Sequence, residues 1–199
     1  MRQAGTHELL SRLLDYPDAS VFAVQPELLP RGPARRAVER FAASLDGVAL
    51  EALRREYVET FDFDRRASLH LTFHRYGDRR RRGIELVRLK RRYAEAGLAL
   101  AEGELPDALP AVLEFAALAP EAGAEVLAGL REPVELVRAR LAERGSRYAH
   151  LLDAVAATQP RLTRAQAERV RRLAEEEPPD ELVGLEPVGA VPELEAVAP

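Results

Sequence analysis

The sequence predicts an all-α fold, a single-domain helical bundle of roughly eight to ten helices. Apolar residues recur three or four positions apart along most of the 199-residue chain, as they do on the buried face of a helix. Only residues 68–76 also alternate between apolar and polar side chains as a strand would. Since no second segment could pair with them in a sheet, we predict a helix there too.

The composition limits the function. Apolar residues make up 47% of the chain, enough for a proper core, and the net charge of −4 argues against a general attraction to nucleic acid or anionic lipid. The absence of cysteine excludes disulfide bonds, thiolate metal sites and a cysteine nucleophile. No run of about 18 apolar residues could span a membrane, and the N-terminal segment is too charged for a signal peptide. We therefore expect a cytoplasmic protein without stable membrane association.

Three helices are predicted in the N-terminal third of the chain. Leucines at helical spacing in residues 9–14 form the first, and the proline-rich residues 17–33 form a loop. An apolar stripe in residues 34–45 marks the second, which ends near Gly47 because glycine accepts the left-handed conformation common after a helix. A further stripe, again four residues apart, runs through residues 49–61.

Two longer helices are predicted in the middle of the chain. Asp78 is placed to cap a helix that continues to about Gly97. Asp107 is placed to cap the next helix, and Pro110 falls in its first turn, where a missing N–H costs little. Apolar residues within 109–117 would form the buried face of that helix.

Four further segments are predicted to be helical towards the C-terminus. Pro120 starts one, and Pro133 should break or kink the chain before the apolar pattern resumes. Residues 148–155 form another short helix. Thr163 and Gln166 have the spacing of a capping box, which would open the last helix.

Residues 177–199 differ in composition from the rest of the chain. They contain six acidic residues, five prolines and no basic residue. Such a segment cannot bury enough apolar surface to offset the entropy of folding. We therefore predict a helical domain at residues 1–176 and a disordered, acidic, proline-rich tail at residues 177–199.

Two patterns could indicate metal or nucleic acid. His70 and His74 would share one helix face, but there is no HExxH motif, so these weak metal candidates are better interpreted as partly buried or groove-lining rings. The segment from Arg75 to Arg92 holds nine Lys or Arg residues and would suit a helical nucleic-acid-binding regulator, our alternative function. Its four consecutive arginines at 79–82 would point all around a helix, however, which favours a solvated or partner-facing surface.

Catalysis has little support in the sequence. Five acids could in principle include a general acid and base, but no nucleophile motif and no phosphate-binding loop accompany them. Aromatic and acidic residues alternate in YVETFDFD, at residues 57–64. Aromatic residues at helical spacing most often belong to the core, yet this alternation would also suit the rim of a groove that binds an amphipathic helix. We predict a binding protein without cofactor or enzymatic activity.

Three segments carry a resemblance to a known family: YVETFD at residues 57–62, SLHLTFHRYGDRRRRG at 68–83 and ELPDALPAVLEF at 104–115. In order and spacing they resemble the NarJ-type nitrate reductase molybdenum cofactor assembly chaperones, or nitrate reductase delta subunits, of the TorD/DmsD group. The resemblance covers about residues 5–155 and implies a TorD-like helical bundle.

The resemblance also implies a function. It predicts a cytoplasmic chaperone that binds the apo catalytic (alpha) subunit of respiratory nitrate reductase at its N-terminal segment. Such a chaperone assists molybdenum cofactor insertion, delays membrane docking until maturation and catalyses no reaction. Proteins of molybdenum cofactor biosynthesis are candidate further partners, and nucleic acid is not expected to be one. The binding face carried over by position, with Leu109 added as an apolar contact, consists of Tyr57, Glu59, Phe61, Asp62, Tyr76, Glu104, Pro106, Asp107 and Leu109.

The chain departs from the family pattern at two places. Asp107 is followed by Ala108 where the family usually has histidine, so no histidine is available there for peptide binding. His70 and His74 stand where aromatic residues such as tyrosine are expected, and their imidazoles can still stack or donate hydrogen bonds.

Overall fold

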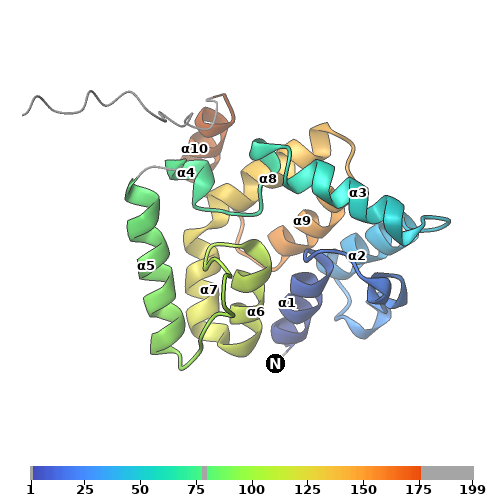
Figure 1. The fold of residues 1–199 in the computed structure, drawn as a ribbon, viewed down its shortest axis with the longest axis horizontal. Coiled ribbons are helices and arrows are strands. Elements are labelled where there is room, and N and C mark those ends of the chain that lie inside the picture. Colours follow the sequence, from blue (N-terminus) through green and yellow to red (C-terminus); the bar gives the residue numbers. More distant parts are fainter. Residues whose placement is uncertain (1, 78–79, 176–199) are drawn as a thin grey trace, which may run out of the picture.

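The computed structural model describes residues 2–77 and 80–175, and these residues form the predicted all-α bundle (Figure 1). Ten α-helices and three 3-10 helices follow one another along the described ranges. In order they are α1 (Arg2–Leu13), η1 (Ala19–Ala23), η2 (Pro26–Leu28), α2 (Pro33–Ala43), α3 (Leu50–Phe61), η3 (Arg65–Ala67), α4 (Phe73–Tyr76), α5 (Arg80–Glu95), α6 (Leu109–Leu118), α7 (Pro120–Gly129), α8 (Arg131–Glu143), α9 (Tyr148–Ala157) and α10 (Arg164–Glu175).

The core lies where helices distant in the sequence pack together. Helix α1 packs against α6, α2 against α9, and α8 against both α9 and α10. Phe41 of α2, Phe115 of α6 and Tyr148 of α9 are almost completely buried there. Each large apolar side chain buried in this way stabilises the fold by about 1.5–3 kcal/mol. The apolar stripes predicted for these helices are therefore the faces that build the core.

Helices α6 and α7 approach each other closely at a glycine. A Cβ atom added to Gly123 of α7 would lie 2.2 Å from the Cα of Ala116 in α6. Two small residues at this position let the backbones of consecutive helices meet. The predicted start of a helix at Pro120 is confirmed, and the same proline leads directly into this contact.

The helix break predicted near Pro133 is present and lies at Leu130, three residues before the proline. Helix α7 ends at Gly129 and α8 begins at Arg131, so the chain changes direction before the proline. Pro133 lies in the first turn of α8, where a backbone N–H would have no partner within the helix. The proline is thus accommodated in the first turn of α8, and the chain is interrupted just before it.

The prediction of a helix over residues 68–76 was wrong for most of that segment. An isolated antiparallel bridge joins His70 to Ala108. The N–H of Leu71 donates to the carbonyl of Asp107 (3.0 Å), and the N–H of Leu109 donates to that of Leu69 (2.9 Å). Helix α4 begins only at Phe73. The alternating pattern therefore did indicate extended backbone, and its partner is the loop before α6.

Two other helix ends can be compared with the sequence. The capping box is confirmed, because the N–H of Gln166 donates to Thr163 Oγ1 (3.2 Å) and that of Thr163 donates to Gln166 Oε1 (2.9 Å). Gly97 follows α5 with a φ of +77°, as expected of a residue after a helix. The predicted cap Asp78 and the tail at residues 177–199 lie outside the described residues.

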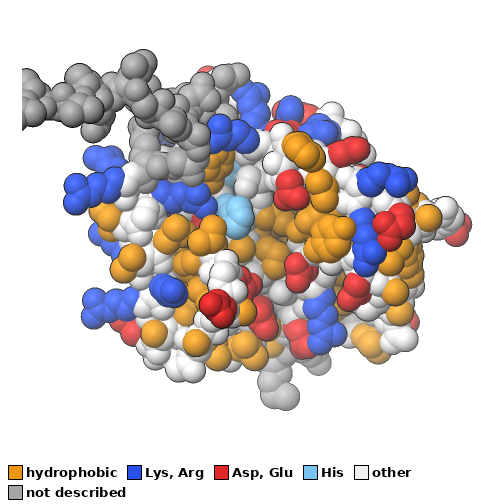
Figure 2. Space-filling view, viewed as in Figure 1, with side chains coloured by type: hydrophobic (Ala, Val, Ile, Leu, Met, Phe, Trp, Pro, Cys, Tyr) orange, Lys and Arg blue, Asp and Glu red, His pale blue; other side chains and the backbone are white. Residues whose placement is uncertain are grey.

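Helix α5 stands at one edge of the bundle (Figure 1), and Tyr93 is its buried residue. The ring of Tyr93 stacks on Phe115 at 4.2 Å, and its hydroxyl donates to the carbonyl of Pro106 (3.1 Å). Lys and Arg side chains gather along this edge, while apolar side chains spread over the middle of the same face (Figure 2). None of the helices formed by the described residues is both long and apolar enough to cross a bilayer.

Candidate functional site

The first group of predicted residues is an aromatic cluster on α3. The ring of Tyr57 lies 4.8 Å from that of Phe61 and 5.8 Å from that of Tyr148, measured between centroids. Its hydroxyl donates to the carbonyl of Leu14 (3.0 Å), which fixes α3 against the end of α1. Burial raises the pKa of Tyr57 well above its ordinary value, so the hydroxyl remains a donor. Tyr57 also meets Tyr16 edge to face at 5.7 Å.

Exposed acids lie beside this cluster. Glu59 and Asp62 are solvent-exposed at the C-terminal end of α3. The next residue, Phe63, is 80% exposed, which is unusual for a phenylalanine. The segment therefore combines negative charge and open apolar surface, as expected of a groove rim that binds a basic amphipathic segment.

Asp107 has a different place from the one predicted. Its side chain does not cap α6, whose N-cap residue is Ala108. The carboxylate is completely buried and accepts hydrogen bonds from the N–H of Thr72 (3.2 Å) and from the Thr72 hydroxyl. Tertiary contacts with the segment before α4 thus take the carboxylate away from the helix that follows it.

An arginine and a histidine complete the cluster around Asp107. The Nη2 of Arg82 lies 3.5 Å from Asp107, and its Nε donates to the hydroxyl oxygen of Thr72 (3.3 Å). The Nδ1 of His70 lies 3.5 Å from the other carboxylate oxygen, a distance that suits an ion pair when the ring is protonated. Burial raises the pKa of Asp107, but the contacts with His70 and Thr72 and the charge of Arg82 outweigh it and hold the pKa below its ordinary value. The carboxylate is therefore ionised at neutral pH.

The other predicted residues in and after the loop before α6 are buried or half-buried. Leu109 is 0% exposed and belongs to the core, and Pro106 is buried beneath Tyr93. Glu104 is half-buried. In the described conformation Asp107 and Leu109 have no surface that a partner could touch, so they support the predicted face from below.

Small pockets connect these groups. One of about 170 Å³ is lined by Phe61 and Asp62 together with His70 and Arg82, and so joins the aromatic cluster to the Asp107 cluster. Tyr76 lines a separate pocket of about 200 Å³ between α4, α5 and α7, together with Thr72. Of the predicted residues, Phe61 and Asp62 thus line one of these pockets and Tyr76 lines the other.

The two histidines do not form the metal pair that helical spacing would give. His74 is buried, its Nε2 donates to the carbonyl of Ser68 (2.8 Å), and burial lowers its pKa so that the ring is neutral. His70 precedes α4 and contacts Asp107 instead. No three His, Asp or Glu side chains within the described ranges are grouped as metal ligands. His70 is partly buried and lines the small pocket beside Phe61, whereas His74 is buried.

The basic side chains between Arg75 and Arg92 form ion pairs and hydrogen bonds with several different parts of the protein. Arg75 donates to the carbonyl of Gly129 (2.9 Å) and pairs with Glu132, and Arg82 turns into the Asp107 cluster. Arg88 pairs with Glu85 of the same helix (2.6 Å). These charges are used largely within the protein, which disfavours a continuous phosphate-binding stripe.

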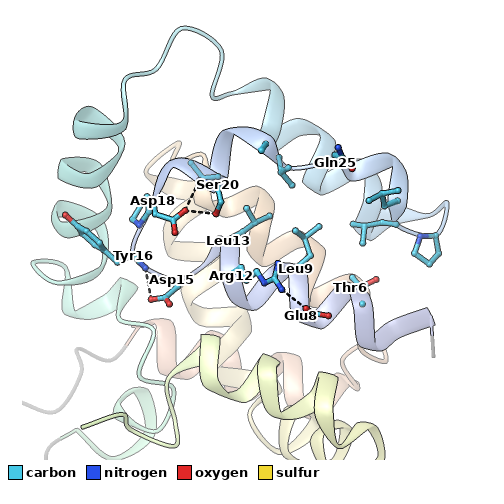
Figure 3. A pocket seen from close by; sticks show the side chains of 18 residues that line it. Thr6, Glu8, Leu9, Arg12, Leu13, Asp15, Tyr16, Asp18, Ser20 and Gln25 are labelled. Atoms are coloured by element: carbon cyan, nitrogen blue, oxygen red, sulfur yellow. Dashed lines mark hydrogen bonds and ion pairs between the residues drawn. The ribbon is translucent and has the colours of Figure 1, made fainter. Parts of the chain in front are cut away.

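A groove along α1 is a feature that the sequence did not reveal (Figure 3). It has a volume of about 580 Å³ and lies between α1 and the segment that contains η1 and η2. Its lining includes apolar side chains from both walls and the acids Glu8, Asp15 and Asp18. The prolines of residues 17–33 predicted only a loop, and periodicity gave no indication that this loop folds into a second wall.

Comparison with known proteins places the chain in a family. Residues 30–154 match the sequence model described as nitrate reductase delta subunit, and this range is more than half of the chain. The chain belongs to the nitrate reductase delta subunit family. The segments YVETFD, SLHLTFHRYGDRRRRG and ELPDALPAVLEF all lie within the matched range, and the resemblance they predicted is confirmed.

Three relatives of this delta subunit family member show how far the likeness extends. It is 39% identical over 151 residues to the nitrate reductase-like protein NarX of Mycobacterium tuberculosis, an alignment that covers 74% of the chain but only 23% of NarX. It is 36% identical over 159 residues to the probable nitrate reductase molybdenum cofactor assembly chaperone NarJ of Bacillus subtilis, with 76% and 86% covered. With the Escherichia coli chaperone NarJ it shares 38% over 156 residues, with 73% and 65% covered.

Proposed function

We propose that this chain is a system-specific chaperone of respiratory nitrate reductase. It would bind the apo catalytic subunit at its N-terminal segment, assist insertion of the molybdenum cofactor and delay membrane docking until maturation. The observation that carries the proposal is the family membership, together with relatives named as nitrate reductase molybdenum cofactor assembly chaperones. The same relatives give no support to a nucleic-acid-binding regulator.

The geometry supports a role in binding. Exposed acids and an exposed phenylalanine follow the aromatic cluster of α3, and the buried Asp107 cluster holds the neighbouring segment in place. Rigid side chains beneath an exposed charged rim lower the entropy lost when a flexible peptide binds. We propose that the exposed and the buried members of the predicted face have different roles. The face consists of Tyr57, Glu59, Phe61, Asp62, Tyr76, Glu104, Pro106, Asp107 and Leu109. Its exposed members would contact the partner, and its buried members would fix their positions.

Under this proposal the protein acts in the cytoplasm by reversibly covering the N-terminal segment of the catalytic subunit, and it catalyses no reaction. The apo catalytic subunit is the proposed partner, and proteins of molybdenum cofactor biosynthesis could receive the complex. Negative charge on the chaperone would speed association with a basic segment more than it would slow dissociation.

The test is capture of the catalytic subunit from cell extract by tagged chaperone, with captured proteins identified by mass spectrometry. The expected result is capture of this subunit, lost when its N-terminal segment is deleted. The double variant Glu59→Lys and Asp62→Lys should reduce capture several-fold, since it reverses two exposed charges. Glu121→Lys with Glu143→Lys, two exposed acids elsewhere, is the matched control. Failure of the wild-type chain to capture the subunit would refute the proposal.

A further inference from the structure

The outer face of α5 combines apolar and basic side chains. Ile84 and Val87 lie three residues apart on this helix and are 48% and 68% exposed. Arg80 precedes Ile84 by four residues and Arg91 follows Val87 by four, so the four side chains form one stripe about 16 Å long. Tyr93, the buried residue of α5, is nine residues from Ile84 and therefore points the opposite way. The stripe thus faces away from the core.

Helix α5 carries more positive charge than its own acids balance. It contains seven Lys or Arg residues and only two glutamates, and both glutamates pair with arginines of the same helix. Three of its basic residues are exposed and have no ion-pair partner within the described ranges, namely Arg80, Arg81 and Lys90. Lys and Arg side chains line the edge of the molecule where α5 stands (Figure 2). An occupant with acidic and aliphatic groups would therefore suit this face.

The sequence that follows the described residues has the complementary composition. Residues 177–199 contain six acidic residues and no basic residue. Within them, residues 180–186 read DELVGLE, with three aliphatic side chains between acids at both ends. This order matches the stripe on α5, where two aliphatic side chains lie between basic ones. A fully extended segment of this length spans about 20 Å, close to the length of the stripe.

The described chain ends on the side of the bundle where α5 begins. Helix α10 ends at Glu175, and Arg169 of this helix pairs with Glu132 at 2.7 Å. The same carboxylate group pairs with Arg75 of α4 at 3.3 Å, and α4 in turn contacts α5. Figure 1 shows α10 at the same end of the bundle as α4 and the start of α5. Residues 176–199 could span up to about 80 Å, more than enough to run along α5.

We propose that residues 180–186 dock on the outer face of α5 in the same molecule. Their aliphatic side chains would cover Ile84 and Val87, and their acids would pair with the three basic residues that lack a partner. Because the tail is tethered, its effective concentration at α5 is on the order of millimolar, so a weak contact is enough. The tail would then neutralise this basic face and compete internally with polyanions for it. This inference goes beyond the proposed chaperone function and does not depend on it.

Zero-length cross-linking tests the contact, because Lys90 is the only lysine in the chain. A carbodiimide joins a lysine amine directly to a carboxylate, without a spacer. In a mixture of isotope-labelled and unlabelled full-length chains, mass spectrometry should find Lys90 joined to an acid of residues 177–199 of the same chain, Glu186 foremost. Products that combine the two isotopes would place the tail on a second copy and overturn the inference. Cross-links from Lys90 only to acids of the described ranges would overturn it too.

Substitutions on α5 separate a specific contact from diffuse attraction of charge. Ile84→Ser with Val87→Ser keeps Lys90 and should lower the yield of the cross-link about three- to tenfold, because the tail loses its apolar contacts. Both positions are exposed, so the fold is kept. Leu28→Ser with Leu118→Ser removes two exposed leucines elsewhere and is the matched control, with the yield of the wild type. If the α5 variant also gives the wild-type yield, charge alone brings the tail to Lys90 and the inference fails.

A change in the tail gives the second readout. Leu182→Ser with Leu185→Ser keeps every acid of the tail and should lower the yield of the cross-link to the same extent as the α5 variant. It should also elute from immobilised heparin, a polyanion, at a higher salt concentration than the wild type, because the basic face of α5 is then open. Elution at the same salt concentration as the wild type would show that the tail does not shield α5, and would refute the inference.

Discussion

Replacing Asp107 by alanine should strongly destabilise the protein. The buried carboxylate accepts two hydrogen bonds from Thr72 and lies 3.5 Å from both Arg82 and His70. Its removal leaves the guanidinium of Arg82, whose side chain is 15% exposed, without this anion. The same carboxylate lies where the segment at 68–72 meets the loop before α6, so the two segments lose one of the contacts that join them, while their backbone bridge remains.

The size of the effect follows from these contacts. Hydrogen bonds to a charged group contribute about 1.5–3 kcal/mol each, and removing one partner of a buried ion pair costs about 3–5 kcal/mol in total. For a domain of this size, each kcal/mol shifts the midpoint of thermal unfolding by roughly 2–4 °C. Asp107→Ala should therefore lower the midpoint by about 6–20 °C. Asp107→Asn should cost less, because its amide oxygen can still accept from Thr72.

Circular dichroism of thermal and urea unfolding measures this effect, with Asp62→Ala as the control at an exposed acid. Because the folded pKa of Asp107 is lowered, its stabilisation is present above the unfolded pKa and disappears as the pH falls through the folded pKa. The stability difference between the wild type and Asp107→Asn should thus be constant near neutral pH and shrink below about pH 4. An Asp107→Ala variant that melts within about 2 °C of the wild type would refute the reasoning.

Three further substitutions test other parts of the packing by urea unfolding. Gly123→Ala would place a methyl group 2.2 Å from the Cα of Ala116 and should cost about 1–3 kcal/mol by forcing α6 and α7 apart. Tyr148→Phe removes a buried hydroxyl that has no hydrogen-bond partner among the described residues, so stability should stay equal or rise by up to about 1 kcal/mol; a clear loss would reveal a partner. Glu132→Ala removes the buried acid that Arg169 of α10 contacts at 2.7 Å and should cost about 2–3 kcal/mol. It should also speed amide hydrogen exchange in α10, whereas unchanged exchange would mean that other contacts hold that helix.

Much of the fold could be predicted because the decisive signals are local. The stripes that became α2, α6 and α9 repeat at the helical period, and the Thr163 and Gln166 pair lies within one turn. The segment at 68–72 could not be assigned in this way, since its partner is a loop more than 30 residues later with no strand-like pattern of its own. The local alternation was consistent with the extended backbone, but only the tertiary contact could decide between it and the helical spacing.

The candidate site was predicted less completely, and the reason is burial. Spacing placed Tyr57 and Phe61 on one face of α3, and the structure confirms that their rings meet. Spacing could not show that Asp107 would be enclosed, because a helix cap and a buried anion both fit an aspartate before an apolar run. Nor could it show the groove along α1, whose second wall depends on how the proline-rich residues fold back.

These differences in burial bear on how partner recognition can be tested in this family member. Asp107 and Leu109 stand out in the sequence but are fully buried, so changing them alters affinity only through the position of neighbouring segments. Glu59 and Asp62 are exposed, and their substitution should change affinity while leaving the unfolding midpoint nearly unchanged. Affinity and stability should therefore change together for the buried group and separately for the exposed group. If Glu59→Lys with Asp62→Lys and Asp107→Ala both lowered affinity in proportion to lost stability, the chain would recognise its partner through its overall fold, and the predicted face would not be a docking site.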